Sequence, residues 1–337
     1  MNKKALLLVC LFVAIFTGLI VLFLNSGTLI FSKSPSISLQ QNPEVIREEW
    51  RSYMKEVGIE KAYLDFKKVY VRSAPFFQHS HMHVIGSLIF QEFGLEGVVY
   101  CDESFMFGCF HGFFGEAFAK SGLEDLHRMD DLCIEKYGEQ EGACQHGMGH
   151  GILVYIGNEK LKKALDICST LKWRYKIGGC KAGVYMEYNF SNVTHTVQKI
   201  RELVPDNPNF PCNELKEVDQ YGCYFAQADW WDSVYKADYK KIGELCEQLL
   251  EDNKEACYLG TGNVALQSSR FRIEPTLQKC DAIASEYGNL LCKAAARWIY
   301  LLNIPQHNLP YESSEIFCNT VDASMRDTCT EKSELVK

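Results

Sequence analysis

Two pairs of histidines in this chain have the spacing that lets one helix hold a metal ion. His79 and His83 are four residues apart, and His146 and His150 repeat that spacing. On an α-helix, residues i and i+4 point the same way, with β-carbons about 5 to 6 Å apart. Two neutral imidazoles so placed can bind one transition-metal ion. The alternative is that each pair only forms hydrogen bonds to backbone carbonyls in a packed helix.

A fifth histidine strengthens the metal hypothesis through its register. His111 lies two residues after Cys109, as His146 lies two residues after Cys144. If the segments around these cysteines stack in register, the two histidines occupy equivalent positions on neighbouring helices. The equivalent positions later in the chain hold no histidine, as expected of a localised site. We predict a transition-metal site with zinc, iron, copper or manganese as the candidate ion, and five imidazoles could serve either one ion with an open position or two ions. Its predicted ligands are His79, His83, His111, His146 and His150.

Two carboxylates share the same register. Glu116 and Glu187 each lie at the seventh position after a cysteine, Cys109 and Cys180 respectively. Either glutamate could be a metal ligand or a catalytic general base, and the alternative for both is an ordinary salt bridge.

The sequence contains no P-loop, no Gly-x-Ser-x-Gly elbow and no Cys-x-x-Cys-His motif for covalent haem. With a net charge of −8 and no long basic run, we expect no nucleic-acid partner.

The elements that must position these side chains are predicted from the cysteines. Of 15 cysteines, Cys10 lies in an apolar segment and leaves fourteen, an even number that predicts seven disulfides in an oxidising compartment. Ten or eleven residues separate the members of six pairs, and the first pair is closer. The pairs are Cys101 and Cys109, Cys133 and Cys144, Cys168 and Cys180, Cys212 and Cys223, Cys246 and Cys257, Cys280 and Cys292, and Cys318 and Cys329.

These pairs recur every 34 to 44 residues, which is the length of a helical-hairpin repeat. In each unit an amphipathic helix ends near the leading cysteine, a polar turn such as 251–255 follows, and the trailing cysteine opens a second helix. A disulfide closing a loop of about a dozen residues stabilises the fold by roughly 3 kcal/mol in the chain-entropy estimate. The predicted fold is all-α: disulfide-stapled helical-hairpin repeats that form a solenoid or a curved superhelix.

This layout resembles disulfide-stapled Sel1-like and tetratricopeptide-type helical repeats in architecture alone, because their tryptophan, glycine and tyrosine spacing is not reproduced. The segments Cys109-Phe-His111-Gly and Cys144-Gln-His146-Gly also make the chain similar to uncharacterised secreted helical proteins with Cys-x-His-Gly helices. Neither resemblance implies an activity.

The N-terminal segment predicts a membrane anchor. Residues 5–24 are apolar and uncharged, long enough for one bilayer crossing, and follow two lysines that favour a cytoplasmic N-terminus. We expect a cytoplasmic stub at 1–4, a transmembrane signal anchor at 5–24, a stalk at 25–41 and an extracytoplasmic helical-repeat domain at 42–337. A cleaved signal peptide and a buried soluble helix are the alternatives for 5–24.

Two functions of different classes follow from these features. The first is a membrane-anchored extracytoplasmic protein with a histidine-rich metal site, as a metal-dependent hydrolase or oxidoreductase acting on a small molecule. The second is a non-catalytic scaffold that binds a peptide, a protein or a glycan on its concave face. Asn189 and Asn192 stand in N-glycosylation motifs, which matter only if the source organism glycosylates there.

Overall fold

The computed structural model describes residues 34–35, 43–138, 142–191, 199–304 and 309–335, and these ranges are predominantly helical, as predicted. The helices of the first half are α2 (Pro43–Val57), α3 (Ile59–Tyr70), α4 (Pro75–Phe93), η1 (Gly94–Tyr100), α5 (Gly108–Ser121), α6 (Leu126–Tyr137), α7 (Ala143–Ile156), η2 (Asn158–Lys160), α8 (Leu161–Cys168) and α9 (Gly179–Asn189). Those of the second half are η3 (Cys212–Glu214), α10 (Glu217–Val234), α11 (Tyr239–Glu247), α12 (Glu251–Ser268), α13 (Ile273–Asp281), α14 (Glu286–Leu302), η4 (Tyr311–Ser314), α16 (Glu315–Asn319), η5 (Ala323–Met325) and α17 (Arg326–Leu335). Between the halves, β1 (Phe190–Ser191) and β2 (Lys199–Ile200) form a short antiparallel pair.

All seven predicted cysteine pairs form disulfides, and their cysteines are buried. In the first half each trailing cysteine opens its helix as predicted, as Cys144 does in α7 and Cys180 in α9. The sulfur bridges therefore lie inside the core, where each one joins the second helix of a hairpin to the segment that precedes it.

The predicted polar turn at 251–255 is wrong. These residues form the first turns of α12, so Cys257 lies well inside its helix instead of opening it. Glu251 and Asp252 occupy the first turn, where negative side chains interact favourably with the positive end of the helix dipole. A polar run at that place is thus compatible with a helix start as well as with a loop.

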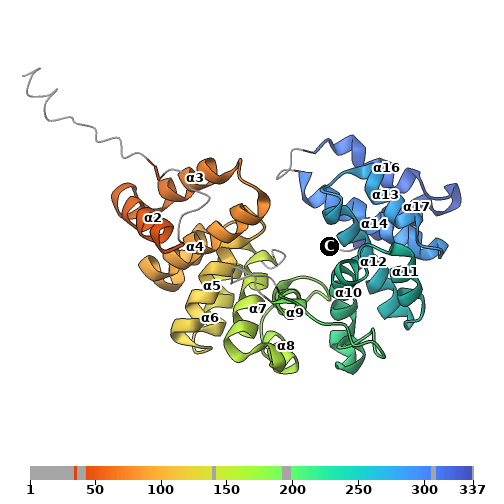
Figure 1. Ribbon diagram of the computed structural model, residues 1–337, viewed down its shortest axis with the longest axis horizontal. Coiled ribbons are helices and arrows are strands. Elements are labelled where there is room, and N and C mark those ends of the chain that lie inside the picture. Colours follow the sequence, from red (N-terminus) through yellow and green to blue (C-terminus); the bar gives the residue numbers. More distant parts are fainter. Residues whose placement is uncertain (1–33, 36–42, 139–141, 192–198, 305–308, 336–337) are drawn as a thin grey trace, which may run out of the picture.

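The helices pack in succession along a curved path, which Figure 1 shows from the N-terminal to the C-terminal half. The second helices of the hairpins contact one another in the order α4, α5, α7, α9, α10, α12, α14 and α17. The first helices α6, α8 and α11 lie along the outer edge of the arc. One large hydrophobic core follows this path, with a smaller cluster around Tyr300 and Phe317.

Glycines allow the second helices to approach closely. A β-carbon on Gly112 of α5 would lie 2.0 Å from the carbonyl oxygen of His83 on α4. A β-carbon on Gly183 of α9 would lie 1.9 Å from the carbonyl oxygen of His146 on α7. Such distances exclude any side chain at these two positions, so glycine fixes the helix spacing beside the histidines.

The first hairpin, α3 and α4, is held by aromatic rings instead of a disulfide. Tyr70 at the end of α3 stacks on His81 of α4, with ring centroids 4.8 Å apart and an interplanar angle of 23°. The two residues are eleven apart in sequence, as are Cys133 and Cys144. The stacked pair therefore occupies the place that a disulfide takes in later hairpins.

The predicted membrane anchor at 5–24 lies outside the described residues, as do the stub at 1–4 and all of the predicted stalk at 25–41 except residues 34–35. Within the described ranges, no helix combines the length and the apolar character that crossing a bilayer would require.

Candidate metal centre

The first histidine pair lies on one face of α4. The Nε2 atoms of His79 and His83 are 3.0 Å apart, as expected of an i, i+4 pair. His79 Nδ1 is 3.0 Å from the carbonyl oxygen of Phe105. Because a carbonyl only accepts hydrogen bonds, Nδ1 carries the ring proton and Nε2 has a free lone pair. That lone pair is directed toward His83 and is available to a metal ion.

The loop that supplies this carbonyl has an unusual backbone. Phe105, Met106 and Phe107 have φ values of 55°, 56° and 61°, in the left-handed region that residues with a side chain seldom adopt. Each such residue costs roughly 1 kcal/mol or more, a strain that the surrounding structure must offset. The loop orients His79 and leads directly into α5, which carries His111.

The second pair, on α7, repeats the arrangement with a stronger partner. The Nε2 atoms of His146 and His150 are 3.0 Å apart, and His150 Nδ1 is 3.0 Å from Glu187 Oε2 on α9. His150 Nδ1 donates a hydrogen bond to the carboxylate, so Nε2 of His150 carries no proton and its lone pair is directed toward His146. Metal-bound histidines in proteins almost always donate their second ring N–H to a carboxylate, a carbonyl or water.

His111 lies between the two pairs. Its ring centroid is 5.1 Å from that of His79 and 5.4 Å from that of His83 on one side. On the other side it is 5.6 Å from His146 and 4.3 Å from His150. The side chain is only 2% exposed, and neither ring nitrogen has a hydrogen-bond partner among the described residues. A buried polar atom left without a partner costs about 1 to 3 kcal/mol, so this ring needs a ligand to explain its position.

The five rings form two groups that could each hold a metal ion, and His111 belongs to both. The groups are His79, His83 and His111, and His111, His146 and His150. Within each group the candidate nitrogen atoms lie within 4.8 Å of one another. Two imidazole nitrogens on one tetrahedral zinc ion would be about 3.3 Å apart, given bonds of about 2.0 to 2.1 Å. Small rotations of the rings would therefore complete either group.

Burial keeps these rings uncharged. It lowers the pKa of His146 to about 4, with the charge of His79 as the second cause. It also lowers the pKa of His83, His111 and His150 well below the usual value, and neighbouring histidines add to the effect. The pKa of His79 is lowered by burial, which the carbonyl of Phe105 partly opposes. At neutral pH the rings are therefore in the form that binds metals.

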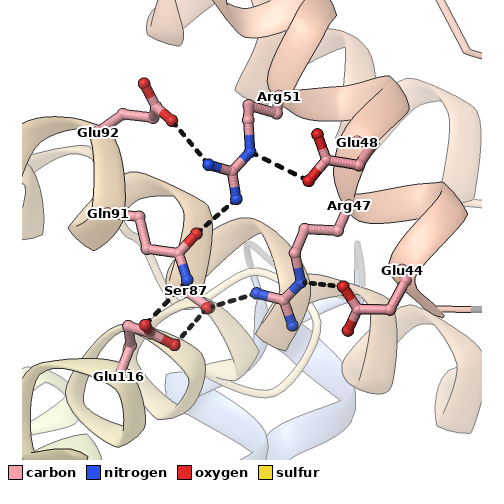
Figure 2. Close-up of polar contacts among 8 residues, drawn as sticks. All are labelled: Glu44, Arg47, Glu48, Arg51, Ser87, Gln91, Glu92 and Glu116. Atoms are coloured by element: carbon pink, nitrogen blue, oxygen red, sulfur yellow. Dashed lines mark hydrogen bonds and ion pairs between the residues drawn. The ribbon is translucent and has the colours of Figure 1, made fainter. Parts of the chain in front are cut away.

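Glu116, the first predicted catalytic carboxylate, lies in a polar network separate from the histidines, which Figure 2 shows. Its oxygens accept hydrogen bonds from Ser87 Oγ at 2.9 Å and from Gln91 Nε2 at 2.8 Å. Arg47 and Arg51 of α2 donate to those two residues in turn. The network joins α2, α4 and α5, and Glu116 belongs to neither of the two metal-binding groups.

Glu187, the second predicted carboxylate, lies beside the histidines, where it orients His150. Sequence reasoning missed the carbonyl of Phe105, because a backbone atom has no signature of its own. His81 stacks on Tyr70 and donates a hydrogen bond from Nδ1 to the carbonyl of Phe77, away from both groups.

Asn189 is buried, and its side-chain oxygen accepts a hydrogen bond from Arg201 Nε at 3.1 Å. The folded chain leaves no room for a glycan there. Asn192 lies outside the described residues.

Comparisons with protein-family models, with curated proteins and with solved structures find no match to this chain. Its function must therefore be inferred from the histidine centre itself.

Proposed function

We propose that this protein binds a transition-metal ion through His79, His83, His111, His146 and His150. The convergence of their nitrogens from α4, α5 and α7 supports the proposal. Partners on α9 and in the Phe105 loop fix the tautomers of two of the rings. A purely structural role accounts for the two hydrogen-bonded pairs, but it leaves His111 buried without a partner in the part of the chain that the structure describes.

The donor set narrows the choice of ion. Imidazole nitrogen suits zinc, copper and iron, whereas manganese is better served by carboxylate, carbonyl and water oxygens. Manganese, one of the four ions considered from the sequence, is therefore the least suited. An ion held by the three nitrogens of either group would have a fourth, tetrahedral position left for water or substrate. Such an open position is what a metal-dependent hydrolase or oxidoreductase requires.

Glu187 has a positioning role in this proposal, since it holds His150 through Nδ1. Glu116 has no role at the metal, because its oxygens are engaged by Ser87 and Gln91. Water that completes the coordination sphere would have to reach the ion past His79, His83 and His146, which are half-buried, because His111 and His150 are buried.

The compartment and the anchor are part of the proposal. Seven buried disulfides support an oxidising, extracytoplasmic location for the helical region. Attachment by residues 5–24, and a solenoid in which the hairpins repeat regularly, rest on the sequence pattern. Extraction of the full chain from membranes by detergent but not by alkaline buffer is the expected behaviour of an anchored protein.

Elemental analysis tests the metal proposal. The full chain, purified under oxidising conditions and supplied in turn with Zn²⁺, Cu²⁺ and Fe²⁺, should retain at least one of these ions after dialysis. His111→Gln should lose most of it, whereas His127→Gln, which alters an exposed histidine, should not. Equal metal in both variants, or none in the unaltered chain, would contradict the proposal.

The scaffold alternative, which is favoured only by the arc of the helices in Figure 1, would then be pursued with peptide and glycan ligands.

A further inference from the structure

We infer that the centre holds two metal ions and that the His111 ring bridges them, one ion on each ring nitrogen. The inference rests on the proposed function and adds the number of ions and their connection. Two observations carry it: His111 is shared by both groups of ligands, and both of its nitrogens are buried with no hydrogen-bond partner among the residues that the structure describes.

A single ion would not account for His111. An ion held with His79 and His83 would use one nitrogen of the ring and leave the other buried and unsatisfied. An ion held with His146 and His150 would likewise use one nitrogen of the ring and leave the other unsatisfied. A hydrogen-bond donor or acceptor without a partner in the interior is costly, so an ion on each side satisfies the ring completely.

The surroundings of the two ions are alike. Each receives the Nε2 atoms of one i, i+4 pair, and in each pair one ring is held at Nδ1 by an outer partner. That partner is the Phe105 carbonyl for His79 and the Glu187 carboxylate for His150. His111 completes three nitrogen ligands for each ion, which leaves each with an open position. The Glu187 carboxylate makes His150 a more basic ligand than His79. The ion beside His150 is therefore held more tightly than the ion beside His79.

Bridging requires a balanced proton transfer. A neutral imidazole carries one proton, on one of its two nitrogens. Binding of an ion to the unprotonated nitrogen leaves that proton in place, and binding of the second ion displaces it to solvent. His83 and His146 need only move their proton from Nε2 to Nδ1, with no net loss. Formation of the bridged centre therefore releases one proton from His111.

Copper(II) provides a direct test, because two Cu²⁺ ions joined through one imidazolate couple their electron spins. The full chain is titrated with Cu²⁺ in excess glycine, which removes weakly held copper, and bound copper is compared with the spins counted by electron paramagnetic resonance. We expect the spin signal to rise with the first equivalent and to fall as the second binds. His79→Gln/His83→Gln should bind half as much copper with its full spin count, and His127→Gln should behave like the unaltered chain.

The outcomes separate the bridge from the metal site. One equivalent of copper with full spin, or two equivalents that show no coupling, would overturn the bridge and leave the proposed function intact. No copper held against glycine would overturn the bridge, and it would overturn the proposed function as well if Zn²⁺ and Fe²⁺ were also not retained. These readings come from the unaltered chain, so they do not depend on whether any variant folds.

Discussion

The helix pair α4 and α5 and the helix pair α7 and α9 are built on the same backbone register. In the first, Gly112 faces the carbonyl of His83, and in the second, Gly183 faces the carbonyl of His146. The reverse contacts match too, since Gly86 faces the carbonyl of Cys109 as Gly149 faces that of Cys180, at 2.0 and 1.9 Å from a β-carbon. His83 is thus the counterpart of His146. Each helix pair also has one glutamate four residues after its glycine, Glu116 in the first pair and Glu187 in the second.

One side-chain difference decides what the glutamate contacts in each region. Four residues after these histidines, α4 has Ser87 and α7 has His150. Ser87 donates to Glu116, and His150 contacts Glu187 at a similar distance. In the first pair the carboxylate therefore joins an arginine network with α2, and in the second it orients a candidate metal ligand. The position of a glutamate in a repeat does not decide its role; the residue that faces it does.

The largest effect is expected from His150→Ser, which gives the second region the side chain of the first. The variant should lose the ion held by His111, His146 and His150 and keep the one beside His79, which halves the bound metal. A serine there could still donate to Glu187, so the fold should persist. Ser87→Ala is the matched control, because it removes the donor to Glu116 without touching a metal ligand. Metal content measured per chain would contradict the comparison if His150→Ser left it unchanged.

Gly183→Ala and Gly112→Ala test whether the shared register depends on glycine. A β-carbon at either position meets a backbone carbonyl, so one helix must move away from the other. We expect each variant to lose about 3 kcal/mol of its free energy of unfolding, the upper end of typical overpacking costs. Urea unfolding without reductant measures this loss. Met186→Ala and Lys120→Ala, at exposed positions of the same helices, should stay within about 0.5 kcal/mol of the unaltered chain.

Glu187→Gln and Glu116→Gln test, one carboxylate at a time, which of the two supports metal binding. Without its charge, residue 187 supports His150 less well, and metal affinity should fall about 10- to 100-fold. Glu116→Gln should leave the affinity unchanged and cost about 1 kcal/mol of stability through its weakened hydrogen bonds. Competition with a chelator gives the affinities. Equal losses in the two variants would show that both carboxylates support the metal or that neither does.

The smallest effect concerns the hairpin without a disulfide. His81→Ala removes the stack on Tyr70 and should cost about 1 kcal/mol, the usual worth of an aromatic pair. Bound metal should not change, since His81 lies in neither group of ligands. A cost near 3 kcal/mol, as a disulfide across such a loop would give, or any loss of metal, would contradict this assignment.

The sequence by itself determined the helical hairpins and the disulfides. Cysteines that recur at a fixed spacing are local information, because each bridge joins two helices separated by a short loop. The histidine pairs are local for the same reason, since the pitch of a helix places His79 with His83 and His146 with His150. Prediction failed at 251–255 because this local pattern is compatible with two structures: acidic residues occur both in turns and in the first turn of a helix.

Only the tertiary structure decided how these pieces meet. The offset of α5 against α4 and α7 places His111 between two pairs that are 63 residues or more apart in sequence, His83 and His146 being the nearest members. The same packing turned Glu187 toward His150 and Glu116 toward Ser87, although both glutamates have one register in the sequence. It also buried Asn189. Such outcomes depend on which residue of a neighbouring helix lies opposite, and that is fixed by close contacts at glycines rather than by any pattern within a helix.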